Sequence, residues 1–338
     1  MRFWYNKSPF RYLLFPFHWL LWLVVYCRKV CYSIGIFNVS AISIPVIVVG
    51  NISVGGTGKS PLVLYLVREL QARGYKPGII SRGYGGNSES YPLSLTVDTK
   101  ASESGDEALM LFQRVKVPMV VAPDRVAAAK YLTKHSDCDI IISDDGLQHY
   151  ALNRDVELVV VEAQRQFGNE LLMPFGPLRE PISRLNSADA VITNLRFAED
   201  TDFDIASKKK FKVYQSQFKA LEFASLNGAE SKSIAALSRA ISEANITVDA
   251  VAGIGNPDAF FSFLKEQGIN IAKHHFKDHH NYQAADFASM NGMILMTEKD
   301  AVKCHGLDLN NAWYLVIDTQ VEDGLVDLCI KKIAAQTN

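Results

Sequence analysis

A glycine-rich segment that ends in lysine and serine is the part of the chain best suited to bind phosphate groups. The segment reads VVGNISVGGTGKSP (48–61); an apolar run leads into it and a helix-like run follows it. In this context backbone N–H groups at a helix N-terminus bind phosphate oxygens, the lysine reaches the outer phosphates, and the serine hydroxyl ligates Mg²⁺. The pattern predicts a P-loop for a nucleoside triphosphate, with these binding residues: Gly55, Gly56, Thr57, Gly58, Lys59 and Ser60.

One position departs from the strict P-loop pattern, because Ser53 stands where that pattern has glycine. Gly55, Gly56 and Gly58 still provide a glycine-rich turn between a strand and a helix. Pro61 suits the first turn of that helix, where its missing N–H is not needed. A glycine-rich connection without a ligand is the alternative interpretation.

Paired carboxylates follow another apolar run, DIIISDDGLQH (139–149), which ends in Asp144 and Asp145. Carboxylate oxygens at a strand end are ligands that Mg²⁺ prefers beside a nucleotide. Either aspartate could instead cap the next helix. Two aspartates directly after an apolar strand favour a metal-binding role.

Two further polar clusters could carry acid–base chemistry. SGDEA (104–108) places Asp106 and Glu107 at a predicted helix start, where ordinary N-capping is the alternative. HHFKDHHNY (274–282) holds four histidines and Asp278 within seven residues, where a polar loop after a strand is the alternative.

Apolar runs alternate with helix-like stretches through the first part of the chain. Alternation of this kind predicts βαβ units and a doubly wound, mostly parallel sheet of the P-loop NTPase type. The predicted strands are 44–51, 76–81, 117–123, 139–145, 156–162 and 188–193, and the predicted helices are 60–73, 105–115 and 124–134.

A second, smaller α/β unit follows a polar stretch around residues 199–212. It opens with FKVYQSQFKALEF, which reads as two strands. Further strands are predicted at 248–255, 269–276, 292–300 and 312–318, with helices at 257–267, 283–290 and 322–335. We therefore expect three parts: an N-terminal segment (1–35), a P-loop domain (36–205), and a smaller α/β domain (206–338) that closes over the site.

The N-terminal segment is basic and apolar. Sixteen apolar-rich residues, YLLFPFHWLLWLVVYC, lie between Arg11 and Arg28, and the first acidic residue is Glu69. As a helix the run would be about 24 Å long, short of the roughly 30 Å hydrocarbon core of a bilayer. A helix lying on an anionic membrane surface is therefore favoured over a spanning one. A cleaved signal peptide and a buried core helix are the alternatives.

The overall composition excludes some classes of protein. Thirty-five Lys and Arg residues against 36 Asp and Glu give a net charge of −1, so bulk positive charge for nucleic acid is absent. A hydrophobic content of 48% indicates a globular chain. Five scattered cysteines without a CxxC pair favour a reducing, cytoplasmic environment over a disulfide scaffold.

The combined motifs resemble the tetraacyldisaccharide 4′-kinases of lipid A biosynthesis. The resemblance runs in order along nearly the whole chain and is far more specific than the P-loop alone. Its blocks are VGNISVGGTGKSP, SRGYGG (81–86), SGDEA, APDR (122–125), DDGLQH (144–149), FGPLREP (175–181), FKDHH (276–280) and TEKDAVK (297–303).

The resemblance implies an ATP- and Mg²⁺-dependent kinase at the cytoplasmic face of the bacterial inner membrane. It would phosphorylate the 4′-hydroxyl of an acylated glucosamine disaccharide 1-phosphate, and it needs neither nucleic acid nor an obligate protein partner. By position, Asp106 and His279 match an acceptor-activating pair, with His280 the other possible histidine. Lys59, Ser60, Glu107, Asp144 and Asp145 match phosphate and magnesium positions. Residues matching the lining of the same cleft are Tyr84, Arg125, His149, Arg179 and Glu180.

Elementary chemistry supports such a pair, because a sugar hydroxyl is a poor nucleophile and a positioned base contributes about 10²- to 10⁴-fold. The family usually has threonine after the P-loop lysine, and Ser60 keeps the hydroxyl. A membrane-associated nucleotide switch is an alternative, but TEKD (297–300) fails the spacing of the guanine-reading [NT]KxD motif. A DHH-type phosphoesterase is a further alternative, which would need aspartate motifs where this chain has its P-loop.

Overall fold

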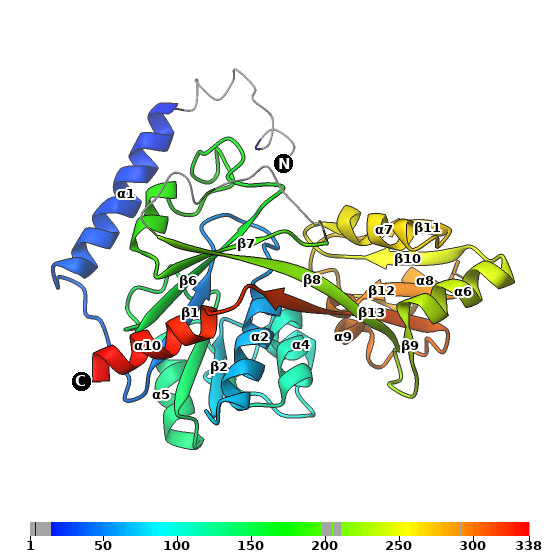
Figure 1. The fold of residues 1–338 in the computed structure, drawn as a ribbon, viewed down its shortest axis with the longest axis horizontal. Helices are drawn as coiled ribbons and strands as arrows, with labels where there is room; N and C mark the ends of the chain where they lie inside the picture. The colour runs from blue at the N-terminus through cyan, green and yellow to red at the C-terminus, as the bar shows by residue number, and fades with distance from the viewer. Residues whose placement is uncertain (1–3, 5–14, 198–204, 206–210, 291, 338) are drawn as a thin grey trace.

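The computed structural model describes residues 4, 15–197, 205, 211–290 and 292–337. These residues form two α/β units side by side, joined by a pair of long strands (Figure 1). All strands belong to one sheet, in the order β11-β10-β12-β13-β8-β7-β6-β1-β5-β2-β4-β3, with β9 paired to β8.

The first unit is built on a parallel sheet with β1 (Val46–Gly50) at its centre, between β5 (Ile140–Asp144) and β6 (Val156–Glu162). Every residue of β1 is buried, as its unbroken apolar sequence predicts for a central parallel strand. The strand order reverses direction at β1, because the chain passes from β5 on one side of it to β6 on the other. In doubly wound sheets, ligands bind at the carboxyl ends of the strands at such a switch point. The other strands are β2 (Pro77–Ser81), β4 (Met119–Val121) and β7 (Ala190–Asn194), with the short antiparallel β3 (Leu93–Ser94) at the edge.

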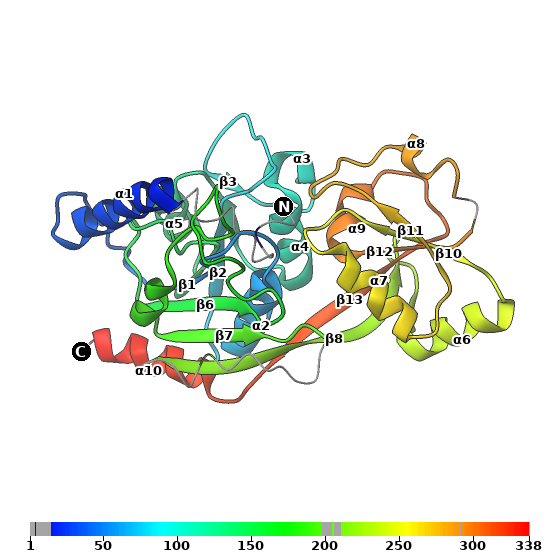
Figure 2. The same cartoon turned by 90° about the horizontal axis from the view of Figure 1, so that it is seen from above.

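Helices cover both faces of this sheet. On one face lie α2 (Lys59–Ala72), α4 (Asp106–Val115) and α10 (Leu325–Thr337), and on the other lie α1 (Phe15–Ser33) and α5 (Arg125–His135). Short helices are α3 (Ala101–Ser104) and a 3₁₀ helix at Ile182–Ser187. Figure 2 shows α1 and α10 at the same end of the molecule.

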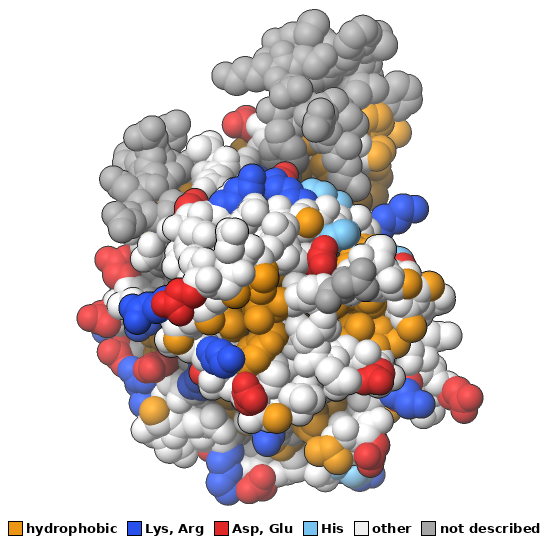
Figure 3. All heavy atoms as spheres, turned by 90° about the vertical axis from the view of Figure 1, so that its right-hand side faces the viewer, with side chains coloured by type: hydrophobic (Ala, Val, Ile, Leu, Met, Phe, Trp, Pro, Cys, Tyr) orange, Lys and Arg blue, Asp and Glu red, His pale blue; other side chains and the backbone are white. Residues whose placement is uncertain are grey.

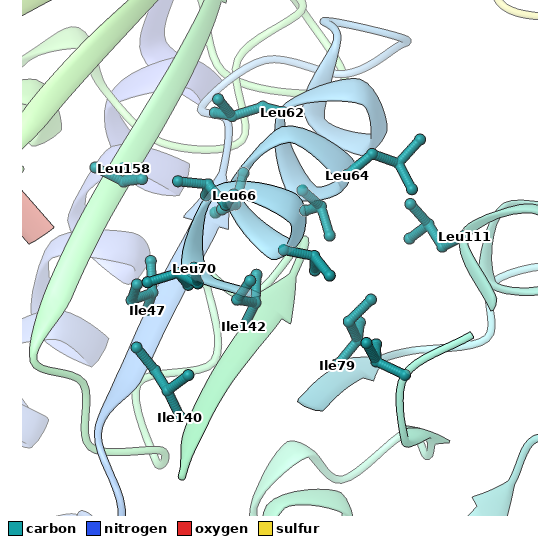
Figure 4. Packing of buried hydrophobic residues seen from close by; sticks show 14 of the residues in the cluster. Ile47, Leu62, Leu64, Leu66, Leu70, Ile79, Leu111, Ile140, Ile142 and Leu158 are labelled. Carbon is teal, nitrogen blue, oxygen red and sulfur yellow. The ribbon is translucent and has the colours of Figure 1, made fainter. Parts of the chain in front are cut away.

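The core under α2 holds the P-loop helix in place. Leu62, Leu66 and Leu70 recur every four residues, so they share one helix face, and they lie over Ile47 and Ile142 of the sheet (Figure 4). Each of these side chains is almost completely buried. Truncation of such a leucine to alanine costs about 2–5 kcal/mol of the free energy of unfolding.

The second unit contains the parallel strands β10 (Val248–Ala252), β11 (Ile271–His275), β12 (Ile294–Thr297) and β13 (Ala312–Val321). Its helices are α6 (Ile234–Ala244), α7 (Pro257–Glu266), α8 (Ala284–Phe287) and α9 (Glu298–Cys304). The strand β8 (Lys212–Ser225) pairs in parallel with β7 and then antiparallel with β13, so it joins the two units. The short strand β9 (Ser231–Ser233) pairs antiparallel with the end of β8.

The fold class is confirmed as a P-loop NTPase-like, mostly parallel sheet, but some predicted elements are wrong in detail. FKVYQSQFKALEF is one long strand rather than two, and α6 was not predicted. The predicted strand 292–300 ends at Thr297, because the Thr297 hydroxyl accepts a hydrogen bond from the Asp300 N–H and caps α9. The division at residues 205/206 stays a prediction, and α10 from the C-terminal part packs on the first unit.

The helix α1 presents apolar side chains in two directions. Leu21, Trp22 and Val25 pack against the core of the first unit. The opposite side chains Trp19, Leu20, Leu23, Val24 and Tyr26 are each at least 50% exposed. Within the described part of the chain no helix is long and apolar enough to cross a membrane. Residues 1–14 of the predicted N-terminal segment, apart from Trp4, lie outside the described residues.

Candidate active site

The glycine-rich segment forms a tight turn between β1 and α2. Gly55 and Gly58 have φ values of 103° and 97°, a region that favours glycine. A Cβ atom at Gly58 would lie 2.0 Å from Nδ2 of Asn194. Gly55 and Gly56 are exposed, so their backbone faces outward at the N-terminus of α2. The turn has the geometry and location of a phosphate-binding loop.

Three side chains hold this turn from inside. Asn51 Nδ2 donates a hydrogen bond to Thr57 Oγ1 (3.0 Å), and Asn194 Nδ2 donates to the Thr57 carbonyl (2.9 Å). The Arg196 guanidinium donates to the Gly56 carbonyl and pairs with Glu162. The sequence analysis missed Asn194 and Arg196, although their place at and after the carboxyl end of β7, two strands from β1, was a usable signal.

The P-loop lysine faces a carboxylate at the end of β5. Lys59 Nζ lies 3.6 Å from Asp145 Oδ1, and Arg179 Nη1 lies 2.9 Å from Asp145 Oδ2. Burial would raise the pKa of Asp145, but the charges of Lys59 and Arg179 outweigh it and lower the pKa to about 2. This carboxylate therefore stays ionised at neutral pH, beside two cations that suit phosphate.

The neighbouring carboxylate of Asp144 is almost completely buried at the carboxyl end of β5. Its Oδ2 accepts a hydrogen bond from Ser81 Oγ (3.1 Å), whereas Oδ1 is buried without a hydrogen-bond partner. Burial, followed by the charges of Glu107 and Asp145, raises the pKa of Asp144 to about 6. An orphaned buried carboxylate oxygen suits a cation.

The oxygen ligands available here fit Mg²⁺ bound together with a nucleotide better than they fit a metal ion coordinated by protein side chains alone. Ser60 follows Lys59 on the first turn of α2, and no group of three or more His, Cys, Asp or Glu side chains forms a metal site among the described residues. Mg²⁺ commonly takes one or two carboxylates and completes its shell with phosphate oxygens and water. Asp144 and Ser60 match that pattern.

A second cluster lies where the two units meet. Nδ1 of His279 lies 3.1 Å from Oδ1 and 3.0 Å from Oδ2 of Asp106, which begins α4. The Asp106 side chain is 4% exposed and that of His279 is 25% exposed. The hydrogen bond to Asp106 raises the pKa of His279 above its ordinary value. Burial opposes ionisation of Asp106, but the His279 hydrogen bond and the Lys299 charge lower its pKa.

The two adjacent histidines point to different partners. His279 has a φ of 61°, and its ring centroid lies 4.9 Å from that of Tyr84. His280 Nε2 instead lies 3.0 Å from Asp286 Oδ2, and its ring contacts Phe276. Of the two histidines, the structure therefore brings His279 to Asp106, as the sequence analysis expected.

Two lysines of α9 complete this cluster and were given no role from the sequence. Lys299 Nζ lies 3.0 Å from Glu107 Oε1, 3.3 Å from Asp278 Oδ1 and 3.9 Å from Asp106 Oδ2. Burial would lower the pKa of Lys299, but these carboxylates raise it above its ordinary value. Lys303 Nζ lies 3.9 Å from Asp106 Oδ2.

The remaining predicted residues divide into two groups. Arg125 is buried, and its guanidinium donates to the carbonyls of Ala122 and Asp144. Burial, followed by the charge of Arg125, lowers the pKa of His149 to about 4, so this ring is neutral. Both lie beside the strand-end carboxylates.

The Glu180 carboxylate differs, because it lies inside a buried network. Gln148 Nε2 donates to its Oε1 at 2.8 Å, the Tyr150 hydroxyl donates to its Oε2, and Arg184 Nε lies 3.3 Å away. With these partners Glu180 shapes the DDGLQH loop rather than presenting a free carboxylate.

The second unit also reaches the P-loop itself. Arg165 Nη2 donates to the Gly255 carbonyl at 3.0 Å. A Cβ atom at Gly255 would lie 3.5 Å from the Gly56 nitrogen and 3.3 Å from Asp278 Oδ2. The loop before α7 therefore lies against the glycine-rich turn, and Asp278 borders this loop.

Comparisons with known proteins identify the family of this chain. The family described as Tetraacyldisaccharide-1-P 4'-kinase matches residues 10–334. A tetraacyldisaccharide 4'-kinase of Colwellia psychrerythraea is 44% identical over 99% of this chain and 97% of its own length. That of Nitrosococcus oceani is 42% identical over 95% of this chain and 90% of its own length.

A solved structure extends the similarity to three dimensions. The crystal structure of LpxK from Aquifex aeolicus, in complex with ATP, superposes with a TM-score of 0.80 at 27% identity, covering 96% of this chain and 99% of that one. The sequence match over nearly the full length and the shared fold lead to one conclusion: this chain belongs to the tetraacyldisaccharide-1-phosphate 4′-kinase family.

Proposed function

We propose that this enzyme transfers the γ-phosphoryl group of ATP to the 4′-hydroxyl of an acylated glucosamine disaccharide 1-phosphate. The product is the bis-phosphorylated lipid A precursor. The observation that carries this proposal is the contact between Asp106 of the first unit and His279 of the second, at 3.0 Å, beside the phosphate-binding turn. Such a pair supplies the base that a sugar hydroxyl needs.

The pair accepts the proton at His279. Asp106 is buried and receives the His279 Nδ1–H, which leaves Nε2 as the basic nitrogen of the more exposed partner. As the bond from the acceptor oxygen to phosphorus forms, the hydroxyl proton moves to Nε2, and the Asp106 carboxylate stabilises the imidazolium. This division of roles follows from the exposure of the two side chains.

The first unit binds the triphosphate. The turn at 55–58 and Lys59 bind phosphate oxygens, and Arg179 lies beside Lys59 across Asp145. Mg²⁺ would be held by Asp144 and Ser60, with Asp145 and Glu107 nearby, and when bound it neutralises charge on the β- and γ-phosphate oxygens. The unpartnered Asp144 Oδ1 supports this assignment.

An anionic membrane surface is the proposed second partner, at the cytoplasmic face of the bacterial inner membrane. The exposed apolar side of α1 supports this location, and Ile34, Ile36 and Phe37 extend it beyond the helix. The far side of the second unit looks different, because there positive and negative side chains are interspersed around apolar patches (Figure 3).

Vesicle sedimentation tests the membrane proposal. Leu20→Asp with Leu23→Asp should reduce binding to anionic vesicles severalfold, whereas the same change at the exposed Val97, far along the chain from α1, should not. High salt should weaken the binding only partly, because apolar burial persists when charge is screened. Equal binding by both double and control variants would contradict a membrane role for α1.

The two alternative functions gain no support from the site. A DHH-type phosphoesterase would use both histidines of the motif on metal, but His279 contacts Asp106 and His280 contacts Asp286. A nucleotide switch does not need an acid–base pair facing the phosphate site.

A transfer assay with γ-labelled ATP and the glycolipid acceptor in detergent tests the kinase activity. Wild-type protein should label the acceptor, and His279→Ala should reduce kcat about 10²- to 10⁴-fold with ATP affinity retained. His280→Ala is the matched control and should stay near wild-type activity. Absence of labelled acceptor with folded, ATP-binding protein would refute the proposed reaction.

A further inference from the structure

The TEKDAVK segment places a cation between the two halves of the site. Lys299 is the second residue of α9, which follows directly after β12 of the second unit. Its side chain is only 15% exposed, and its ammonium reaches across to Glu107 of the first unit at 3.0 Å. Lys299 has none of the roles proposed so far in binding phosphate, magnesium or the acceptor's proton.

The hydrogen bonds of this ammonium leave one donor open. A lysine has three N–H donors. Two are used, on Glu107 Oε1 at 3.0 Å and on Asp278 Oδ1 at 3.3 Å. The next oxygen, Asp106 Oδ2, lies at 3.9 Å, beyond hydrogen-bond distance. Within the described part of the chain the third N–H has no acceptor, so it is available to another group.

The two residues that hold Lys299 both border the phosphate side. The charge of Glu107 acts on Asp144, which lies at the proposed metal position. Asp278 Oδ2 lies close to Gly255, which in turn lies against the Gly56 nitrogen of the P-loop. Asp106, on the third side, carries the histidine that receives the acceptor's proton. Lys299 therefore lies between residues beside the proposed phosphate site and the Asp106–His279 pair proposed to receive the acceptor's proton.

Simple attachment of α9 to the first unit does not require Lys299. Arg114 of α4 already binds Glu298 of α9 with distances of 2.8 and 2.7 Å to its two carboxylate oxygens, and it also donates to the Ile317 carbonyl. Lys303 of the same helix also lies 3.9 Å from Asp106 Oδ2 of the first unit. The structural connection is thus made by other residues of the same helix.

We propose that Lys299 is a catalytic residue of phosphoryl transfer, whose free N–H binds an oxygen of the transferred phosphoryl group. The inference rests on the proposed function. In the step, the acceptor oxygen bonds to the γ-phosphorus, the bond from phosphorus to the β,γ-bridging oxygen breaks, and ADP leaves. The acceptor's proton passes to His279, and Lys299 keeps its own protons. A fixed cation here stabilises the charge on the transferring oxygens without reorganisation.

The test uses Lys299→Met, which keeps most of the side-chain volume and removes the charge. We expect kcat to fall about 10²- to 10³-fold, as on loss of one transition-state donor. KM for ATP and for the acceptor should change by less than about threefold. The loss in kcat should persist at pH values above the acidic limb of the kcat–pH profile, and the limb itself should move to higher pH, because the Lys299 charge lowers the pKa of His279. Lys299→Arg should recover part of the activity. Lys277→Met, at an exposed position of the FKDHH segment, is the matched control.

A second measurement separates this inference from the proposed acceptor. Binding of ADP in the presence of aluminium fluoride, which mimics the transferring phosphoryl group, does not require the glycolipid. Wild-type protein should bind ADP more tightly with the fluoride, and Lys299→Met should lose that gain while binding ADP alone normally. If wild type shows the gain but no glycolipid transfer, the proposed function fails and Lys299 is still assessed.

Three outcomes would overturn the role of Lys299. The first is near-wild-type kcat in Lys299→Met, and the second is an unchanged fluoride-dependent gain in that variant. The third is a loss in kcat that disappears at pH values above the acidic limb, because that would show Lys299 acting only through the pKa of the Asp106–His279 pair instead of on the phosphoryl group.

Discussion

The contact between Asp106 and His279 predicts that the two residues act as one unit. Replacing either residue removes the same proton transfer, so the second replacement has little left to remove. We expect Asp106→Asn and His279→Gln each to lower kcat about 10²- to 10⁴-fold, which is about 3–5 kcal/mol of transition-state stabilisation. The double variant should fall at most a few fold further.

The loss in kcat expected for the double variant differs from the loss expected if the two residues acted independently. With two independent roles, the losses would multiply to about 10⁴- to 10⁸-fold in the double variant. Nδ1 of His279 lies within 3.1 Å of both Asp106 oxygens, and the pair buries a carboxylate that is 4% exposed. Neither residue is assigned to the phosphates, so ATP affinity should change much less than turnover.

The assay is initial-rate transfer of labelled phosphate to the glycolipid, with ATP affinity and circular dichroism measured on the same proteins. His280→Gln is the matched control, because it is the adjacent histidine and contacts Asp286 instead. Multiplying losses, or a damaging His280→Gln beside a silent His279→Gln, would refute the pair.

Four further results are expected. Lys59→Ala should abolish most transfer with the fold retained by circular dichroism, because the cation 3.6 Å from Asp145 is lost from the phosphate site; wild-type turnover would sink the P-loop assignment. Gly58→Ala should cost about 1–3 kcal/mol in urea unfolding, since its φ is 97° and its new Cβ would meet Asn194 at 2.0 Å, whereas Gly56→Ala, with nothing within 4 Å, should not. Activity should decrease as the pH is lowered through the pKa of His279, which lies above the ordinary value of 6.5, because protonated His279 cannot accept a proton. In Asp106→Asn the residual activity should decrease only at lower pH, because the hydrogen bond that raises this pKa is weakened. The stabilisation from the same pair should be fully present below pH 6.5 and lost as pH rises through the raised pKa, which urea unfolding of His279→Gln across pH would show as a difference that shrinks at alkaline pH.

Local pattern was enough to predict where the glycine-rich turn and the strand-end carboxylates lie. The P-loop turn and the carboxylates of Asp144 and Asp145 each follow an apolar parallel strand, and the carboxyl ends of such strands meet at one edge of the sheet. Each of these features can be predicted from a single short segment of the sequence. Strand β8 was harder, because its change from parallel to antiparallel pairing depends on β7 and β13, which lie elsewhere in the chain.

Long-range contacts could not be derived from spacing. His279 and Asp106 are 173 positions apart, and their pairing was expected only from resemblance to a family. The choice between His279 and His280 depends on a positive φ at His279, which turns the two rings in different directions. A role for Lys299 was not predicted either, because its contact with Glu107 is also long-range. The TEKD segment was interpreted as the end of a strand, whereas it is the capped start of the helix α9.

Division of the catalytic groups between two units has a chemical consequence. The groups proposed to bind phosphate belong to the first unit, whereas the proposed proton acceptor His279 and the cation Lys299 come from the second. The contacts of Arg165 with Gly255 and of Lys299 with Glu107 form only when the units are together. If the smaller unit closes over the site as predicted from the sequence, water that reaches a bound triphosphate before closure meets neither group, and this favours transfer to the sugar over hydrolysis of ATP.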